Sequence, residues 1–261
     1  MTSAMAGTET SEHRKKTTQR SLAIAELLME LDGATLSDVS KEMDLAKSTA
    51  YAHLETLRDG GYLVKEDGTY YVGLQFLNLG GYAATRKRSY KLAREKVRQL
   101  ADATNERAQF IVEENGLGYY VFSDSESTMA VETDVRPGKL TFLHTTAAGK
   151  AILANLPRRR VEEIVESRGL PGQTERTITD PAALFEELEL VRERGYAYNR
   201  SERVEKQWAV GVPVVGPGGT VVGGLSVSGP EHRMKGDRYR DELPSLLLGV
   251  ANELELNLAY A

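Results

Sequence analysis

Residues 17–73 place three short helical patterns ahead of two strands joined by a tight turn, and this order leaves few architectures open. The first helical pattern runs roughly from Thr17 to Leu31, and Asp32-Gly33 closes it. Its apolar residues Leu22, Ala25, Leu28 and Met29 recur at helical spacing, with Ile24 and Leu31 beside them.

The second and third helical patterns are short and amphipathic. Thr35 opens the second as an N-cap, with Asp38 three residues on. Its buried stripe is expected to hold Leu36, Val39 and Met43. The third starts near Lys47 or Ser48, and its expected buried residues are Ala50, Leu54 and Leu57. That stripe turns a second set of residues outward: Lys47, Ser48, Tyr51, Ala52 and Glu55.

A β-hairpin follows the third helix. Gly60-Gly61 ends the helix, Tyr62 to Val64 is typical of a strand, and Asp67-Gly68 supplies the positive-φ turn before Tyr70 to Val72 returns. Three helices followed by such a wing form the ground plan of a winged helix-turn-helix, which reads DNA with its third helix. Small polar, cationic and aromatic residues at the start of that helix suit entry into a major groove.

The net charge of this segment opposes a simple attraction to DNA. Residues 1–73 hold eight Lys or Arg and twelve Asp or Glu, a net charge of −4. Affinity for DNA must therefore depend on where the cations lie, with backbone N–H groups meeting further phosphates. The cations expected to do so lie at the start of the first helix, on the third helix and in the wing: Lys15, Lys16, Arg20, Lys47 and Lys65.

Two further helical patterns precede a change of period. Leu74 to Ala84 is expected to form an interdomain linker helix, and Ser89 to Ala103 the first helix of a larger domain. Between them, Arg86-Lys87-Arg88 indicates a solvated linker, with contact to flanking DNA as the alternative. From Glu106 the apolar period becomes two, as in strands. The expected strands are 109–113, 119–122, 129–133, 196–199, 208–215 and 220–228.

Helices interrupt these strands. Thr145 to Leu156 is one, Asn155 is expected to cap a second with Pro157 in its first turn, and Asp180-Pro181 opens a third that runs to Gly195. A closing helix spans about Asp237 to Leu258. This order favours an α+β domain with a largely antiparallel sheet flanked by helices. We expect a disordered tail (1–14), a winged helix-turn-helix domain (15–73), a linker helix (74–88) and a second domain (89–261).

Composition and motif spacing argue against several classes of protein. The 261 residues contain no cysteine, so disulfides and thiolate sites are excluded. No apolar run approaches the length of a membrane span, and we expect a cytoplasmic protein. The segment around Gly149 lacks residues that a phosphate loop needs, and Gly224 to Gly229 has the wrong spacing for a nucleophile elbow. The four histidines lack the spacing of metal ligands, so we expect no metal site. Because these motifs fail, we also expect no catalytic residue and no cofactor.

These segments together resemble the IclR family of transcriptional regulators. In the first domain the resemblance rests on TTQRSLAIAELL, TLSDVSKEMDLAKSTAYAHLETLRDGGYL and DGTYYVGLQFLNLG. In the second it rests on KLTFLHTTAAGKAILANLP, on the stretch from ERGYAYNRSE to WAVGVPV, and on GGTVVGGLSVSGP. The final HRMKGDRYRDELPSLLLGVANELELN is most similar to archaeal members. The resemblance covers nearly the whole chain from Thr17 and implies a GAF-like effector-binding second domain.

The resemblance also implies a pocket for a small organic effector, commonly a carboxylate, between the sheet and the helix that follows LHTTAAGKA. By matching position, the pocket residues would be Phe142, Ala148, Gly149, Asn199, Gln207, Trp208, Ala209, Ser226 and Ser228. Ser226 and Ser228 are two apart on a strand, so both hydroxyls should face one side. Ala148-Gly149 at a helix start would leave N–H groups open to an anion. The alternatives are serine hydroxyls satisfied by backbone, and close helix packing at Ala148-Gly149.

Two departures from the family pattern affect function. Family members often have Arg where this chain has Ala52, so base reading should move to the residues Lys47, Ser48, Thr49 and Tyr51. Asn199 replaces an acidic residue and Trp208 is added, which would favour an anionic or ring-bearing effector. The alternative for Trp208 is a core aromatic at a strand start.

The leading hypothesis is a ligand-responsive transcription factor. A homodimer or a dimer of dimers would place two recognition helices on a pseudo-palindromic operator in double-stranded DNA, and a small organic effector would change how the larger domains associate. The alternative is a small-molecule sensor or an enzyme whose winged helix serves only dimerisation or protein interaction. The effector, the operator sequence and the choice between activation and repression stay open.

Overall fold

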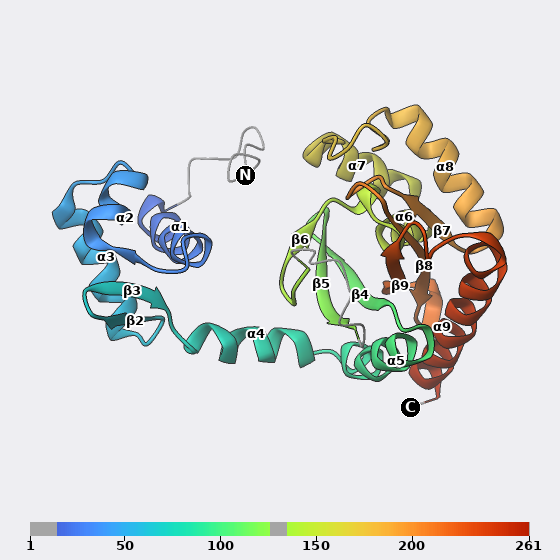
Figure 1. Cartoon of the computed structure of the whole chain (residues 1–261), viewed down its shortest axis with the longest axis horizontal. Helices are drawn as coiled ribbons and strands as arrows, with labels where there is room; N and C mark the ends of the chain where they lie inside the picture. The colour runs from blue at the N-terminus through green and yellow to red at the C-terminus, as the bar shows by residue number, and fades with distance from the viewer. Residues whose placement is uncertain (1–14, 126–134, 261) are drawn as a thin grey trace. The chain divides into compact units, whose positions relative to one another are not determined.

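The computed structural model describes residues 15–125 and 135–260, and the chain divides into two compact units between Ala83 and Ala84 (Figure 1). Helix α4 (Gln75–Thr85) runs through this division. Each unit has a hydrophobic core of its own. The strand expected at 129–133 lies outside the described residues.

The first unit combines helices with a small antiparallel sheet. Before α4 its helices are α1 (Lys16–Glu30), α2 (Leu36–Glu42) and α3 (Lys47–Asp59). Its strands are β1 (Ala34–Thr35), β2 (Leu63–Glu66) and β3 (Thr69–Val72), in the order β1-β3-β2. The order of three helices and a hairpin confirms the expected winged helix-turn-helix. The added strand β1 has only two residues, too few for an alternating pattern to reveal.

Local side-chain chemistry sets the ends of these elements. At the start of α2, the Asp38 N–H donates to Thr35 Oγ1 at 3.3 Å, while the Thr35 N–H donates to Asp38 Oδ2 at 3.0 Å. In the wing, Asp67 and Gly68 have φ angles of 47° and 88°. Two consecutive positive φ values are what a two-residue type I′ hairpin requires. Both features match the expectation from sequence because each depends on residues close along the chain.

The buried face of α1 is narrower than its apolar pattern. Its buried residues are Ile24, Ala25 and Leu28. Three other residues of the apolar pattern are about half exposed: Leu22, Met29 and Leu31. The pattern is wider than the buried face because α1 packs mainly against α3 and β3, and a short contact of this kind covers only a narrow side of a helix.

The second unit is built on one six-stranded antiparallel sheet, with strands in the order β6-β5-β4-β9-β8-β7. Its strands are β4 (Arg107–Glu114), β5 (Leu117–Asp124), β6 (Leu140–Thr141), β7 (Ala197–Arg200), β8 (Gln207–Val215) and β9 (Val221–Pro230). This arrangement confirms the expected α+β class. The hairpin turn at Asn115-Gly116 has φ angles of 54° and 81°, again the positive pair.

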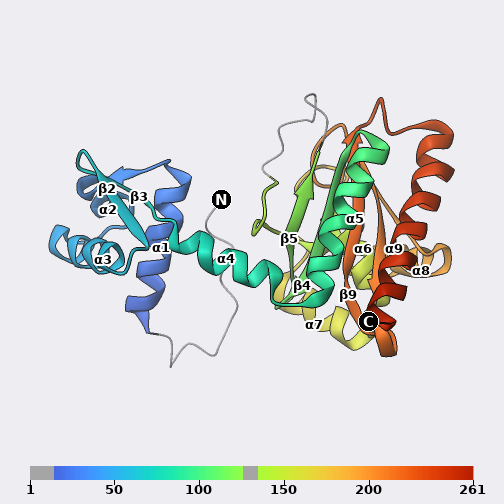
Figure 2. The ribbon, with the colours of Figure 1, turned by 90° about the horizontal axis from the view of Figure 1, so that it is seen from below.

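Helices cover both faces of this sheet (Figure 2). They are α5 (Arg88–Thr104), α6 (Ala147–Asn155), α7 (Arg158–Arg168), α8 (Pro181–Arg194) and α9 (Leu243–Ala259). On one face, which we call the α9 face, Val210, Val212, Leu225 and Val227 pack with α5 and α9. On the other, the α6 face, Ile111, Tyr120 and Ala197 pack with α6, and α7 and α8 complete that layer.

Two details of the expected helices need correction. Asn155 does not cap α7, since it is the last residue of α6 and its Nδ2 donates to the Ala151 carbonyl at 2.9 Å. Pro157 takes the N-cap position of α7 instead, without a side-chain cap. The closing helix is also interrupted, because a π-helical turn at Arg238–Glu242 precedes α9. Within the described ranges, no helix has the length and apolar character needed to span a membrane.

Candidate functional sites

The candidate recognition surface is the outward side of α3. Lys47, Ser48, Tyr51 and Ala52 are exposed and Thr49 is half-buried, while Ala50, His53 and Leu54 lie in the core. No side chain caps the start of α3, and its first turn holds no acidic residue. The positive end of the helix dipole is therefore open on this side, which favours an anionic group such as a phosphate.

His53 has a structural role that the sequence did not reveal. Its Nδ1 lies 2.8 Å from the Ser21 hydroxyl, and the imidazole is 8% exposed. This hydrogen bond joins α1 to α3. The exposed cations Lys15, Lys16 and Arg20 lie at the start of the same α1.

The wing cation is partnered within the first unit. Lys65 Nζ donates to the Tyr70 hydroxyl at 3.0 Å, and that hydroxyl donates to Glu55 Oε1 at 2.8 Å. The hydrogen bond to Tyr70 raises the pKa of Lys65, so the ammonium stays charged at the surface. Glu55 also pairs with Arg58 at 2.7 Å. The prediction that Glu55 faces outward is wrong, because the wing folds back onto this carboxylate.

The candidate effector site lies on the α6 face of the sheet, where strand register aligns two rows of residues. One row runs across four strands through Arg107, Ser228, Ala209 and Asn199. The adjacent row contains Gln109, Ser226 and Gly211. Ser226 and Ser228 therefore share a side, as their spacing predicted.

The two serines differ in their partners. The Ser226 hydroxyl donates to Gln109 Oε1 at 3.1 Å. Ser228 is 6% exposed, and its buried hydroxyl has no hydrogen-bond partner within the described ranges. Neither hydroxyl bonds the backbone, which was the alternative. Ser228 is thus the more available donor.

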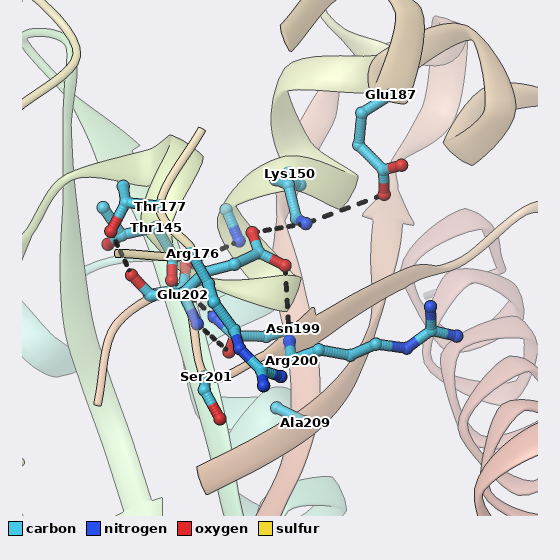
Figure 3. Close-up of polar contacts among 12 residues, drawn as sticks. Thr145, Lys150, Arg176, Thr177, Glu187, Asn199, Arg200, Ser201, Glu202 and Ala209 are labelled. Carbon is cyan, nitrogen blue, oxygen red and sulfur yellow. Dashed lines mark hydrogen bonds and ion pairs between the residues drawn. The ribbon is translucent and has the colours of Figure 1, made fainter. Parts of the chain in front are cut away.

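Asn199 is committed to other contacts of the protein (Figure 3). Its Nδ2 donates to the Thr145 carbonyl at 2.5 Å, and its Oδ1 accepts the Glu202 N–H at 3.2 Å. Because both ends of the amide are used, Asn199 holds the start of the β7–β8 turn against the segment before α6.

The helix start at Ala148-Gly149 is closed rather than open. The Gly149 N–H donates to Thr146 Oγ1, the N-cap of α6, at 3.0 Å. Ala148 packs so closely on β8 that a Cβ at Gly211 would lie 2.4 Å from the Ala148 nitrogen. The expectation of N–H groups open to an anion is wrong for Gly149, and close packing is the arrangement found at Ala148.

Trp208 lies on the opposite side of the sheet from the two serines. It packs against the α9-face core, and its ring centroid lies 5.0 Å from that of Tyr239. Its neighbour Ala209 faces the α6 side, with Gln207 two residues before it at the start of β8. A single pocket containing Trp208, Ser226 and Ser228 is therefore excluded by the alternation of β8.

Phe142 lies at the approach to α6. It is half-buried and precedes the 3₁₀ turn Leu143–Thr145, and its ring centroid lies 6.0 Å from that of His144. The His144 Nε2–H donates to the Pro171 carbonyl at 3.3 Å. Burial lowers the pKa of His144, and the charge of Lys150 lowers it further.

A buried ion pair holds the β7–β8 turn (Figure 3). Lys150 Nζ lies 2.6 Å from Glu202 Oε2 and 3.6 Å from Glu187 Oε1, and Lys150 is 1% exposed. Thr177 Oγ1 donates to the Glu202 carbonyl at 2.6 Å. The feature of the sequence that could have indicated this pair is a lysine within the small-residue helix of residues 145–156, because an ammonium buried there requires a partner. Its partner could not be read from sequence.

One more cation reaches this face. The guanidinium of Arg203, in the β7–β8 turn, lies 5.2 Å from the centroid of the Tyr120 ring on β5. Burial lowers the pKa of Arg107, and the charge of Arg203 lowers it further. No group of three or more histidine, aspartate or glutamate side chains suited to a metal ion occurs in the described part of the chain.

Comparison with protein families gives two matches that follow one another along the chain. Residues 17–67 match the IclR helix-turn-helix domain, and residues 83–256 match the bacterial transcriptional regulator IclR C-terminal domain. A probable HTH-type transcriptional regulator ArcR of Halobacterium salinarum is 34% identical over 244 residues, which cover 91% of this chain and 92% of the relative.

Solved structures share the fold over almost the full length. The IclR structure of Thermotoga maritima has a TM-score of 0.79 and 26% identity, covering 94% of this chain and 99% of that one. An IclR homolog of Microbacterium hydrocarbonoxydans, complexed with 4-hydroxybenzoate, has a TM-score of 0.76 and 21% identity, covering 93% and 99%.

Proposed function

The chain belongs to the IclR family of transcriptional regulators, and we propose that its outward α3 residues read a pseudo-palindromic operator while its α6-face site binds a small organic carboxylate. The family and its relatives are regulators rather than enzymes. The proposed division is a DNA-binding domain at 15–73, a linker helix at 74–88 and an effector-binding domain at 89–261. We further propose that the protein acts in the cytoplasm.

The exposed side of α3 supports the proposed DNA contacts. Lys47, Ser48 and Tyr51 lie beside the uncapped start of the helix, where hydrogen-bond donors and a positive dipole end coincide. Thr49 and Ala52 would contribute shape rather than charge. Lys65 and the three cations of α1 (Lys15, Lys16, Arg20) would contact phosphates, which position the reader without selecting sequence.

The unpartnered Ser228 hydroxyl is the observation that carries the proposed effector site. Buried hydroxyls are nearly always hydrogen-bonded, so one left without a partner in the described chain suggests a place for a ligand. Ser226, Ala209, Gln207 and Phe142 would surround it on the same face. Ala148, Gly149 and Asn199 would shape the site from behind, and Trp208 would support β8 from the α9 face.

The bound ligand of the Microbacterium homolog supports the chemical class. That ligand, 4-hydroxybenzoate, combines a carboxylate with a compact ring. Hydroxyl and amide donors can bind a carboxylate through charge-assisted hydrogen bonds. We therefore propose an effector that joins one carboxylate to a compact organic body.

The apolar surface of α4 supports a homodimer or a dimer of dimers. This helix has no buried residue. Leu77 and Leu79 of this helix are 69% and 47% exposed, and Leu74 immediately before it is 80% exposed. Exposed apolar side chains gathered in one segment mark an interaction surface. A second copy of the chain would cover them. Light scattering behind a sizing column measures this directly, and a monomer at micromolar concentration would contradict it.

The proposed function is tested by binding to the DNA upstream of the gene for this chain. Fluorescence anisotropy with that labelled DNA should show saturable binding that survives an excess of unrelated DNA at fixed salt. Adding the effector should change the measured affinity. Equal affinity for the upstream and the unrelated DNA would contradict sequence-specific reading.

A further inference from the structure

The proposed effector site contains groups that can recognise the charge of its ligand, a reading that rests on the proposed function. Ser228 lies between Arg107 on β4 and Ala209 on β8 in the register of the sheet. Its hydroxyl is buried and has no partner in the described chain, so a bound group beside it would gain a hydrogen bond that nothing else takes.

The guanidinium of Arg203 lies on the same face. Its β7–β8 turn lies at one side of the sheet, whereas Tyr120, whose ring its guanidinium contacts at 5.2 Å, lies on β5. In the sheet, β9 and β4 lie between β8 and β5, and these two strands carry Ser228 and Arg107. The Arg203 charge acts on both Tyr120 and Arg107. Because Arg107 pairs with Ser228 in the register of the sheet, the guanidinium lies near the buried serine.

The guanidinium of Arg203 retains its hydrogen-bonding capacity. Within the described ranges it contacts the Tyr120 ring and makes no hydrogen bond or ion pair. A guanidinium presents five N–H donors in a planar fork that matches a carboxylate. The charges of Arg203 and Arg107 repel each other, as the lowered pKa of Arg107 shows. A negative group between the two guanidinium groups would reduce this repulsion.

The turn that carries Arg203 is anchored at the residue before it. The buried Lys150 pairs with Glu202, the residue immediately before Arg203, at 2.6 Å. Ser201 and Lys206 adopt positive φ angles of 66° and 59°, which shape the turn. Because the backbone beside it is fixed, the Arg203 side chain starts from a defined position, as selective recognition requires.

We propose that Arg203 selects acidic effectors, its guanidinium pairing with the effector carboxylate while the Ser228 hydroxyl donates a further hydrogen bond. The ligand class is a small organic acid rather than its neutral amide or ester. A site built only from hydroxyl and amide donors would discriminate far less between these, since an amide can also accept their hydrogen bonds.

The test compares acids with their neutral amides on the full chain. Thermal shift and calorimetry would use four matched pairs, formed from 4-hydroxybenzoate, benzoate, succinate and lactate with the corresponding amides. The variants are Arg203→Gln, Arg203→Lys, and Arg176→Gln as a control for an exposed arginine nearby. Wild type should prefer at least one acid to its amide by about 10-fold or more.

Arg203→Gln should lose that preference by weakening acid binding at least about 10-fold with little effect on the amide, because a charged partner is removed. Arg203→Lys should keep part of it, and Arg176→Gln all of it. A purely structural role for Arg203 would weaken acid and amide alike, which would overturn the inference. Unchanged acid preference in Arg203→Gln would also overturn it and leave the proposed function intact. If no acid bound wild type, both the inference and the proposed carboxylate effector would fall.

Discussion

The ammonium of Lys150 and the carboxylate of Glu202 lie 2.6 Å apart, although 52 residues separate them along the chain. Their side chains are 1% and 11% exposed, so water does little to screen the pair. The contact joins α6, which is buried along almost its whole length, to the turn that ends β7 and begins β8. It therefore sets the position of the turn that borders the candidate effector site.

Breaking this pair should strongly destabilise the second unit. Lys150→Met leaves the Glu202 carboxylate buried without its closest partner, and we expect a loss of about 3–5 kcal/mol in the free energy of unfolding. Adding Glu202→Gln should restore part of that loss, because the buried charge is removed. Urea denaturation measures both. Arg159→Met, which breaks an exposed pair with Glu163, is the control and should change stability within error.

Ser226 and Ser228 should respond differently to replacement by alanine. Ser226→Ala leaves Gln109 Oε1 without its recorded donor and should cost about 1–3 kcal/mol of stability. Ser228→Ala removes a hydroxyl with no described partner, so the free protein should be as stable as wild type or more so. The same variant should weaken the effector response about 10-fold or more. Urea melts and effector-dependent release of operator DNA check the two parts, and a normal response in Ser228→Ala would rule out its role in binding.

The recognition face of α3 can be tested with two substitutions. Lys47→Ala and Tyr51→Ala should each weaken operator binding by about 1–3 kcal/mol, because each variant removes a side chain proposed to contact a base. Neither side chain is part of the buried core of the first unit, so the melting temperature should not change. Lys91→Ala removes an exposed lysine from α5 and serves as the control. Operator affinity of both variants equal to that of wild type, at fixed salt, would show that α3 does not read the bases.

His144 should make the second unit less stable in mild acid. Burial lowers its pKa in the folded state below the ordinary 6.5, with Lys150 adding to the effect. Below about pH 6.5 the unfolded chain binds a proton that the folded imidazole does not, so stability falls as pH falls toward the lowered pKa. His144→Gln, whose amide can still donate to the Pro171 carbonyl, should lose this component. Unfolding free energies of both proteins between pH 5 and 8 check it, and parallel curves would contradict the assignment.

The second unit should fold alone only if α5 is included. Tyr90, Val97 and Leu100 of this helix are buried in the α9-face core. A fragment of residues 84–261 should therefore melt cooperatively and self-associate, whereas one of residues 106–261 should not fold cooperatively, because it exposes that core. Calorimetry and light scattering distinguish them. Equal cooperativity in the two fragments would show that α5 is dispensable.

Features that depend on neighbouring residues were determined by the sequence alone. The Thr35–Asp38 capping box, the positive-φ turn at Asp67-Gly68 and the Asp180 N-cap were all predicted and are all found. Each depends on hydrogen bonds or backbone angles within about four residues, so the residue types themselves decide the geometry. The alternation of apolar residues likewise determined that the second unit would contain antiparallel strands.

Tertiary structure alone decided which residues share the candidate site. Strand alternation could place Ser226 and Ser228 together, but which side α6 would cover, and that Trp208 would face α9, depended on how the whole sheet packs. The buried Lys150 needs a charged partner, and only the path of the chain over 52 residues brings Glu202 to it. Short-range rules act through a few fixed bonds, whereas contacts between distant segments depend on the packing of every element between them.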